Sequence, residues 1–157
     1  PHKESADIAS ANSRIEMLKL AIKGNPNFSI SDIEIKRGGK SYTIDTIRAL
    51  KEKSPFDKFY FLIGSDLLTC FDGWKDINEI TKLVTFVVAT RPGFSVADVG
   101  NYLASQQVGI KTLDIRAVDI SGYSIRSAIR AGRSFRYLVP DKVYNYITKK
   151  RIYQIKY

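Results

Sequence analysis

The sequence is poor in residues on which several classes of protein depend. Its 157 residues include one cysteine, one histidine and one tryptophan. A single cysteine cannot form an intramolecular disulfide, which excludes a disulfide scaffold and favours a reducing compartment, the cytoplasm. One cysteine and one histidine also exclude a Cys/His zinc cluster. No apolar run approaches the roughly 20 residues that a membrane-spanning helix needs, so we expect no membrane partner.

The composition that remains is that of an ordinary globular domain, with 44% hydrophobic and 26% charged residues. The length suggests one domain covering residues 1–157. The net charge of +9 is uneven, because residues 116–157 carry ten Lys and Arg against Asp119 and Asp141. A basic segment of this kind favours a phosphate-bearing partner, although a solvated basic surface would show the same charge.

The hydrophobic pattern alternates between helical and extended segments. Helices are predicted at 10–23, from a cap at Ser41 or Thr43 to about residue 50, and at 67–71, 77–83, 96–107, 124–130 and 141–150. Extended segments are predicted at 28–35, with a bulge, and at 59–63, 84–89 and 109–115. The apolar runs 59–63 and 84–89 are typical of strands buried on both faces of a sheet. This alternation predicts an α/β domain with a mainly parallel sheet.

Ligands of such sheets lie beyond the carboxyl ends of the strands, which directs attention to three segments. Gly64 lets a ligand approach the backbone, and Asp66 can accept hydrogen bonds from ribose hydroxyls; a turn glycine and a capping aspartate are the plainer alternative. The second segment, Arg91–Gly93, follows the next predicted strand. Ser121, Ser124 and Arg126 begin a helix, where backbone N–H groups, hydroxyls and a guanidinium can bind phosphate; ordinary serine capping would use the same residues.

Aromatic and hydroxyl side chains form a second group. Trp74, followed by Lys75, stands in a loop-like stretch and could stack on a flat ring, although a lone tryptophan usually belongs to a core. Tyr42 and Thr43 precede a helix and could hold a small anion, or they could simply cap it.

Several longer strings follow one another along the chain: Pro1-His2-Lys3, Ser41-Tyr-Thr-Ile-Asp-Thr46, Phe61-Leu-Ile-Gly-Ser-Asp66 with Phe71 and Trp74, Arg91-Pro-Gly93, Ile120-Ser-Gly-Tyr-Ser-Ile-Arg126, and Arg136-Tyr-Leu-Val-Pro140 with Tyr146-Ile147. Taken in this order, the strings resemble those of the bacterial nicotinate-nucleotide adenylyltransferases over the whole chain. The resemblance implies a Rossmann-like nucleotidyltransferase fold and adenylyl transfer from ATP to nicotinate mononucleotide. The products would be nicotinate adenine dinucleotide and pyrophosphate, with Mg²⁺ assisting, in NAD biosynthesis.

The resemblance also implies roles for the residues that match its motifs. Ser121, Ser124 and Arg126 would hold the ATP phosphates, and Ser124 and Arg126 would act in catalysis. Gly64 and Asp66 would lie against adenosine. Tyr42, Thr43, Trp74 and Lys75 would surround the nicotinate ring and its carboxylate. No protein-held metal site is implied.

Two departures from the family pattern carry expectations of their own. Gly122 and Tyr123 replace the second Ser and the Thr of the family's Ile-Ser-Ser-Thr-x-Ile-Arg string, so one hydroxyl contact is lost and a phenol must be accommodated. The family's opening Gly-x-Phe-x-Pro-x-His-x-Gly-His string, with the first strands around it, is absent from the printed residues. We therefore expect the printed chain to be an N-terminally truncated piece that is inactive in isolation. Through its open strand edges such a piece could form a homo-oligomer.

Two other functions remain as alternatives. The basic segment carries interleaved tyrosines and could bind nucleic acid, although part of this pattern fits the buried face of the last helix. The acceptor could also be another phosphate compound, such as phosphopantetheine, although Tyr42, Thr43 and Trp74 favour a flat pyridine ring.

Overall fold

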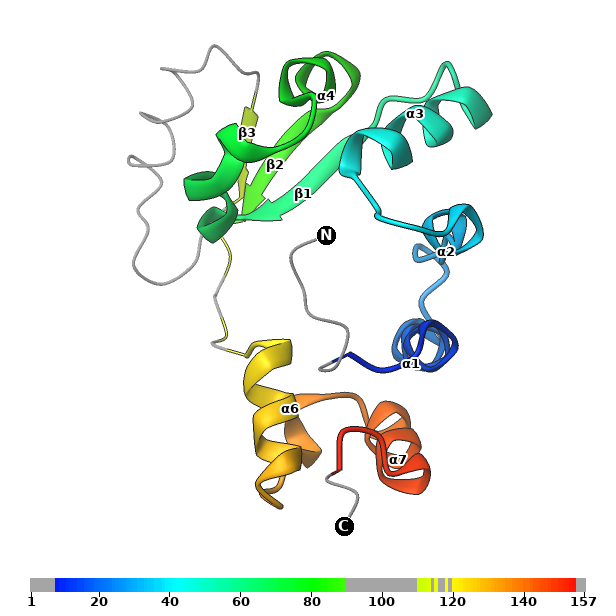
Figure 1. The fold of residues 1–157 in the computed structure, drawn as a ribbon, viewed down its shortest axis with the longest axis vertical. Helices are drawn as coiled ribbons and strands as arrows, with labels where there is room; N and C mark the ends of the chain where they lie inside the picture. Colours follow the sequence, from blue (N-terminus) through cyan, green and yellow to red (C-terminus); the bar gives the residue numbers. More distant parts are fainter. Residues whose placement is uncertain (1–7, 90–109, 114, 116–117, 119, 155–157) are drawn as a thin grey trace. The chain divides into compact units, whose positions relative to one another are not determined.

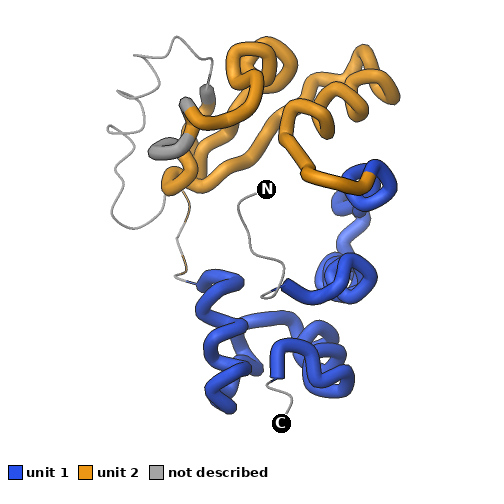
Figure 2. Tube along the Cα trace, in the orientation of Figure 1, with its two compact units in different colours: residues 1–37, 120–157 blue, residues 38–119 orange. Residues whose placement is uncertain are grey.

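The computed structural model describes residues 8–89, 110–113, 115, 118 and 120–154, with the side chains of 68–70, 72 and 110 left aside. The chain divides into two compact units, Pro1–Arg37 with Ile120–Tyr157, and Gly38–Asp119 (Figure 2). Each unit has its own apolar core. The predicted helix at 96–107 and the Arg91–Gly93 string lie outside the described residues.

The unit Gly38–Asp119 is built on a parallel sheet. Its strands are β1 Tyr60–Gly64, β2 Thr85–Ala89 and β3 Ile110–Leu113. They lie side by side in the order β1-β2-β3, and both neighbouring pairs are parallel (Figure 1). The predicted α/β fold with a parallel sheet is therefore confirmed.

One face of this sheet is covered by helical segments. These are α3 Thr43–Lys53, the 3₁₀ helix η2 Ser65–Gly73 and α4 Ile77–Leu83. Their shared core includes Phe86 and Val88 of β2, which are fully buried. Alternation along a strand sends neighbouring side chains to opposite faces, and Tyr60 and Leu62 remain 55% and 62% exposed. The prediction that residues 59–63 are buried on both faces is thus wrong for the described part of this unit, because α3, η2 and α4 all contribute to the same core.

The unit formed by the two ends of the chain is helical. Its elements are α1 Ala11–Ile22, α2 Ile33–Arg37, α6 Gly122–Arg130, the 3₁₀ helix η3 Arg136–Leu138 and α7 Asp141–Lys150. Its core joins the buried residues Ile129, Phe135, Val143 and Ile147 to Met17 and Leu20 of α1. None of the helices that the structure describes has the length and apolar character of a membrane span.

Helix ends explain where the sequence predictions succeed and where they fail. Ser10 caps α1 as predicted, accepting a hydrogen bond from the Ser13 backbone N–H. Neither Ser41 nor Thr43 caps α3: the N-cap is Tyr42, whose side chain makes no capping bond. The predicted extended segment 28–35 is also wrong, because residues 33–37 form α2, held by an i,i+4 ion pair between Asp32 and Lys36.

Candidate functional site

The start of α6 is closed by a reciprocal serine cap. Ser121 Oγ accepts a hydrogen bond from the Ser124 backbone N–H at 3.0 Å, and Ser124 Oγ accepts one from the Ser121 backbone N–H at 3.2 Å. Ser124 Oγ also donates to the Ser121 carbonyl at 2.8 Å. The two serines therefore cap the helix, as the simpler alternative in the sequence analysis held. The cap takes up the Ser124 N–H and leaves the N–H groups of Gly122 and Tyr123 at the helix start, where anions usually bind.

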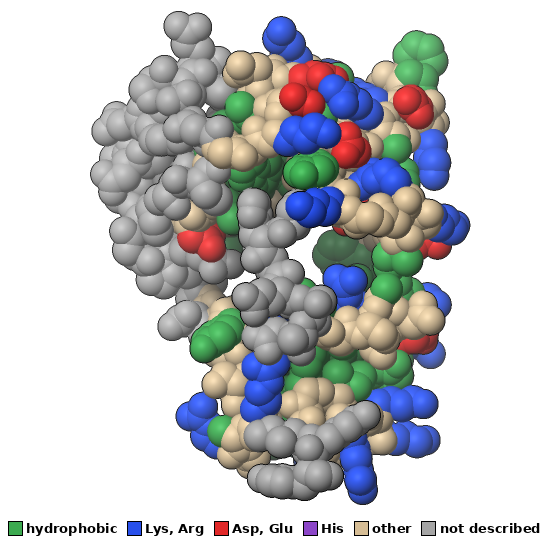
Figure 3. All heavy atoms as spheres, viewed as in Figure 1, with side chains coloured by type: hydrophobic (Ala, Val, Ile, Leu, Met, Phe, Trp, Pro, Cys, Tyr) green, Lys and Arg blue, Asp and Glu red, His purple; other side chains and the backbone are tan. Residues whose placement is uncertain are grey.

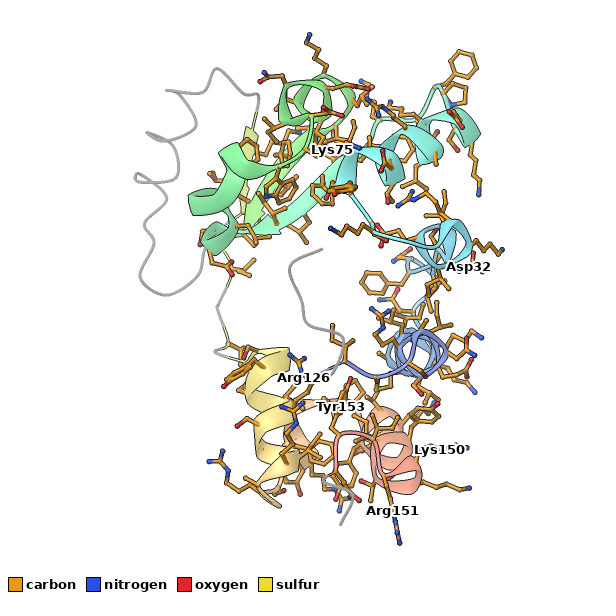
Figure 4. All side chains as sticks on the ribbon, in the orientation of Figure 1. Asp32, Lys75, Arg126, Lys150, Arg151 and Tyr153 are labelled. Carbon is orange, nitrogen blue, oxygen red and sulfur yellow. The ribbon has the colours of Figure 1, made fainter. Side chains whose placement is uncertain are left out.

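Arg126 lies at the same helix start (Figure 4). A Cβ added to Gly122 would lie 3.1 Å from Arg126 Nη1, so the guanidinium sits against the backbone of the first turn. Arg126 Nε is buried and has no hydrogen-bond partner among the described residues. A buried donor without a partner is costly, and an anion at the helix start would satisfy it.

Gly122 and Tyr123, which replace a Ser and a Thr of the family string, are both accommodated without strain on buried space. Gly122 leaves room for the Arg126 guanidinium, and Tyr123 is 70% exposed, so its phenol needs no buried space. Around them, residues 120–154 carry eight Lys and Arg against Asp141. Lys and Arg side chains accordingly lie along the surface of α6 and α7 (Figure 3). This surface attracts anions to the helix start.

Gly64 and Asp66 lie at the carboxyl end of β1, the edge at which ligands of parallel sheets bind. Gly64 is the N-cap of η2 with φ −78° and ψ 151°, an extended conformation open to any residue. Asp66 is exposed in the first turn of η2, and Ser65 between them is fully buried. The strand therefore ends in a short segment that presents one carboxylate at this edge.

Tyr42 and Lys75 meet although 33 positions separate them in the sequence. Lys75 Nζ lies 4.6 Å from the centre of the Tyr42 ring, in a cation–π contact. The same ammonium is 4.0 Å from Asp45 Oδ1. Thr43 is the first residue of α3, next to Tyr42. One positive charge thus stands over an aromatic ring at the start of a helix.

Trp74 is half-buried at the edge of an aromatic cluster. Its ring centre is 5.9 Å from those of Phe61 and Phe71 and 6.4 Å from that of Phe86. Trp74 also lines an open hollow of about 510 Å³, whose other lining residues are Asp76, Ile77, Asn78, Glu79 and Lys82. Trp74 therefore serves the core and also presents a surface. The hollow itself carries two carboxylates and one lysine, which is a poor match for an anion.

The sequence analysis missed a charged cluster between α3 and α4. Arg48 Nε donates to Glu79 Oε1 at 2.8 Å, and Arg48 Nη2 pairs with Glu79 Oε2. The hydrogen bond from Arg48 holds the pKa of Glu79 below its ordinary value, and the same bond raises the pKa of Arg48. Acidic and basic side chains intermix over this region in Figure 3. Helical periodicity indicates which residues share a helix face, but not that residues 31 positions apart form a pair.

The predicted site residues form three local groups. Ser121, Ser124 and Arg126 lie together at the start of α6, in one unit. Gly64 and Asp66 lie at the end of β1, in the other unit. Tyr42, Thr43 and Lys75 gather at the start of α3, with Trp74 preceding Lys75 along the chain.

A parallel sheet with polar residues at the carboxyl end of β1 is typical of ligand-binding α/β proteins. A family model described as cytidylyltransferase-like matches residues 1–128. Two structures of nicotinic acid mononucleotide adenylyltransferase from Plasmodium falciparum share this fold. The one complexed with APC has a TM-score of 0.76 and covers 93% of this chain and 77% of that one. The one complexed with NaAD has a TM-score of 0.78, and the match covers 98% of this chain and 78% of that one. Both are 19% identical in sequence, so their likeness concerns the fold. The chain is a nucleotidyltransferase of the cytidylyltransferase-like class.

Curated relatives identify the family within this class. A probable nicotinate-nucleotide adenylyltransferase of Geobacter sulfurreducens is 41% identical over 174 residues, which cover 98% of this chain and 79% of that protein. One from Geobacillus thermodenitrificans is 39% identical over 153 residues, covering 98% and 67%. The nicotinate-nucleotide adenylyltransferase of Bacillus subtilis is 34% identical over 154 residues, covering 98% and 77%. The chain belongs to the nicotinate-nucleotide adenylyltransferase family.

Proposed function

We propose that this protein transfers the adenylyl group of ATP to nicotinate mononucleotide, giving nicotinate adenine dinucleotide and pyrophosphate in NAD biosynthesis. Family membership supports the reaction, and the observation that carries it is the start of α6. There, Arg126 lies against the first turn with a buried Nε that has no partner among the described residues.

The ATP phosphates bind at this helix start. The N–H groups of the first turn and the planar Arg126 fork meet phosphate oxygens, and the helix dipole adds to the attraction. Ser121 and Ser124 keep the turn in the binding conformation through their reciprocal cap. Gly64 and Asp66 contact the adenosine part, where the Asp66 carboxylate accepts hydrogen bonds from ribose hydroxyls.

We assign the nicotinate ring to Trp74, with its carboxylate directed to Lys75 and not into the hollow that Asp76 and Glu79 line. An indole whose face is only half-buried offers a stacking surface for a flat pyridine ring. Lys75 supplies the positive charge for the ring carboxylate, because its ammonium is held over Tyr42 and only 46% of its side chain is exposed. Tyr42 and Thr43 add hydroxyl groups at the start of α3.

The chemistry needs no covalent intermediate. The 5′-phosphate oxygen of the acceptor attacks the α-phosphorus of ATP in line, the bond to the β-phosphate oxygen breaks, and pyrophosphate leaves. Negative charge grows on the transferring group and on pyrophosphate, so catalysis consists of positioning and electrostatic stabilisation. Arg126 and the α6 N–H groups are the donors arranged for that charge.

Mg²⁺ enters this proposal as a partner of ATP. Within the described residues, no cluster of three His, Cys, Asp or Glu side chains could hold a metal ion. Mg²⁺ is commonly bound by substrate phosphates with few protein ligands, which fits a cation carried by ATP. When bound, it would neutralise charge on the leaving pyrophosphate. We place the reaction in the cytoplasm because of the single cysteine.

The test is an acceptor-selection assay. Purified full-length protein is incubated with ATP and Mg²⁺ and with nicotinate mononucleotide, nicotinamide mononucleotide or phosphopantetheine, and both pyrophosphate and the adenylylated product are quantified. We expect transfer to nicotinate mononucleotide to exceed transfer to the other two acceptors. Equal transfer to phosphopantetheine would contradict the assigned acceptor. Steeply salt-dependent nucleic-acid binding without any ATP binding would instead favour the nucleic-acid alternative, which the comparisons do not favour.

A further inference from the structure

Arg48 joins α3 to the beginning of α4 through several carboxylates. Besides its bond to Glu79, its Nη2 lies 3.6 Å from Asp76 Oδ2. Its Nη1 lies 3.7 Å from Asp45 Oδ1 on its own helix. A planar guanidinium can serve such a set because its donors form a rigid fork, which a lysine ammonium does not provide.

The backbone at Asp76 needs this support. Asp76 has φ 54° and ψ 39°, in the left-handed region that non-glycine residues occupy at a cost. It is the N-cap of α4, yet its side chain makes no capping hydrogen bond. An aspartate at an N-cap ordinarily accepts from its own helix. Here the carboxylate lies near Arg48 instead, so the turn is stabilised from a different helix.

The turn that ends at Asp76 carries the residues assigned to the nicotinate ring. Trp74 and Lys75 immediately precede Asp76, and the Lys75 ammonium lies 4.6 Å from the centre of the Tyr42 ring. A shift of the turn would therefore move the indole and the ammonium together. Their positions depend on the contact between α3 and α4.

Arg48 and Lys75 lie near the same carboxylate. Asp45 Oδ1 lies 3.7 Å from Arg48 Nη1 and 4.0 Å from Lys75 Nζ, so the two cations share one carboxylate. Without Arg48, Asp45 would pair with Lys75 alone. The ammonium would then attract a substrate carboxylate less strongly.

We propose that Arg48 is a positioning residue for acceptor recognition: it holds the Trp74–Asp76 turn and keeps Asp45 from neutralising Lys75. The substrate named in this inference rests on the proposed function, and Arg48 is not among the site residues predicted from the sequence. Removing Arg48 should weaken binding of nicotinate mononucleotide more than binding of nicotinamide mononucleotide, since only the former carries the ring carboxylate.

The first test needs no substrate. Trp74 is the sole tryptophan of the chain, so its fluorescence reports on this turn alone. We compare acrylamide quenching of the wild type with Arg48→Gln and Arg48→Lys. Lys53→Gln removes one charge from the exposed end of the same helix and is the matched control. The expected result is increased quenching in Arg48→Gln, a smaller increase in Arg48→Lys, and no change in Lys53→Gln.

The second test is kinetic. In Arg48→Gln the KM for nicotinate mononucleotide should rise about tenfold, less than the roughly 10²-fold that a misplacement of about 1 Å can cost. The KM for ATP should stay near the wild-type value, and Arg48→Lys should recover part of the loss. If Arg48→Gln does not fold, Arg48→Lys and Glu79→Gln carry the comparison.

Several results would overturn the inference. Unchanged Trp74 quenching in both Arg48 variants would show that Arg48 does not hold the turn. If the KM values for nicotinate mononucleotide and for ATP rose equally, or if Lys53→Gln raised the KM for nicotinate mononucleotide as much as Arg48→Gln does, the effect of Arg48 would be a general structural one. If the full-length wild-type protein transfers nothing to nicotinate mononucleotide, the proposed function fails, whereas the quenching comparison still decides whether Arg48 holds the turn.

Discussion

Gly122 and Arg126 lie four residues apart in α6, and their spacing places a guanidinium beside the bare backbone of the helix start. The sequence string indicated a phosphate site there, but it could not indicate that Arg126 Nε would be buried without a partner among the described residues. This observation distinguishes Arg126 from the other arginines of the basic segment. It assigns a ligand-directed role to one side chain among many.

Replacing Arg126 tests this role at the residue scale. In Arg126→Ala, turnover should fall by about 10²–10³, the scale for removing one preorganised donor to developing charge. Arg126→Lys should recover little, because an ammonium lacks the planar fork. Steady-state kinetics with saturating acceptor measures the effect. Arg133→Ala removes an exposed arginine just after α6 and serves as the control; equal losses in the two alanine variants would refute the assignment.

Individual contacts could be predicted from the sequence where the two residues lie within one helical turn of each other. Ser121, the N-cap of α6, and Ser124 in its first turn bond to each other, and their spacing alone predicts that contact. The Arg48–Glu79 pair joins two helices across 31 positions, so no local pattern could reveal it. The contact between Lys75 and Tyr42 was equally hidden, although both residues were predicted as neighbours of one ligand.

At the scale of elements, the cap of α6 should contribute measurably to stability. Ser121→Ala removes the acceptor for the Ser124 N–H, and loss of such a cap costs about 0.5–2 kcal/mol. Urea denaturation without ligand measures the free energy of unfolding. Ser134→Ala, at an exposed position after the helix, should change it by less than about 0.5 kcal/mol. A Ser121→Ala protein as stable as the wild type would show that the cap does not hold the helix start.

The pair between α3 and α4 should make stability depend on pH. The pKa of Glu79 is lowered in the folded protein by its hydrogen bond from Arg48, so at acid pH the unfolded chain binds this proton first. The contribution of the pair is complete above the ordinary glutamate pKa and is lost as pH falls through the lowered folded value. Glu79→Gln should therefore lose stability at neutral pH and show a shallower decline below about pH 5.

Unfolding free energies measured at a series of pH values check this prediction. Lys82 is the other cation that lowers the pKa of Glu79, so Lys82→Gln should change the profile less than Arg48→Gln does. Parallel profiles for the wild type and Glu79→Gln would show that the pair does not contribute in this way.

Elements bounded by clear terminal signals could be predicted from the sequence. The helix 77–83 was predicted with the observed limits, and α7 follows Pro140 as expected. The segment 28–35 failed because apolar spacing alone did not reveal the Asp32–Lys36 ion pair that accompanies α2. The apolar run 59–63 predicted a strand correctly, but its two faces differ, which depends on what packs against the sheet.

At the scale of the whole molecule, the fold followed from the alternation of elements, and the ordered strings indicated the family. Composition set the broad class, and the charge of residues 116–157 indicated an anionic partner. The partner could not be derived from charge alone, because nucleic acid and nucleotide share phosphate chemistry. The family comparisons distinguish them, with curated relatives that cover 98% of the chain.

The central claim is that the start of α6 receives the phosphates of ATP. The most direct measurement is the backbone ¹⁵N–¹H spectrum of the protein during titration with a non-hydrolysable ATP analogue. We expect the amide signals of Gly122 and Tyr123 to shift with the analogue concentration, and Arg126→Ala to weaken this response. Saturable binding that leaves both amides unshifted while signals elsewhere move would contradict it.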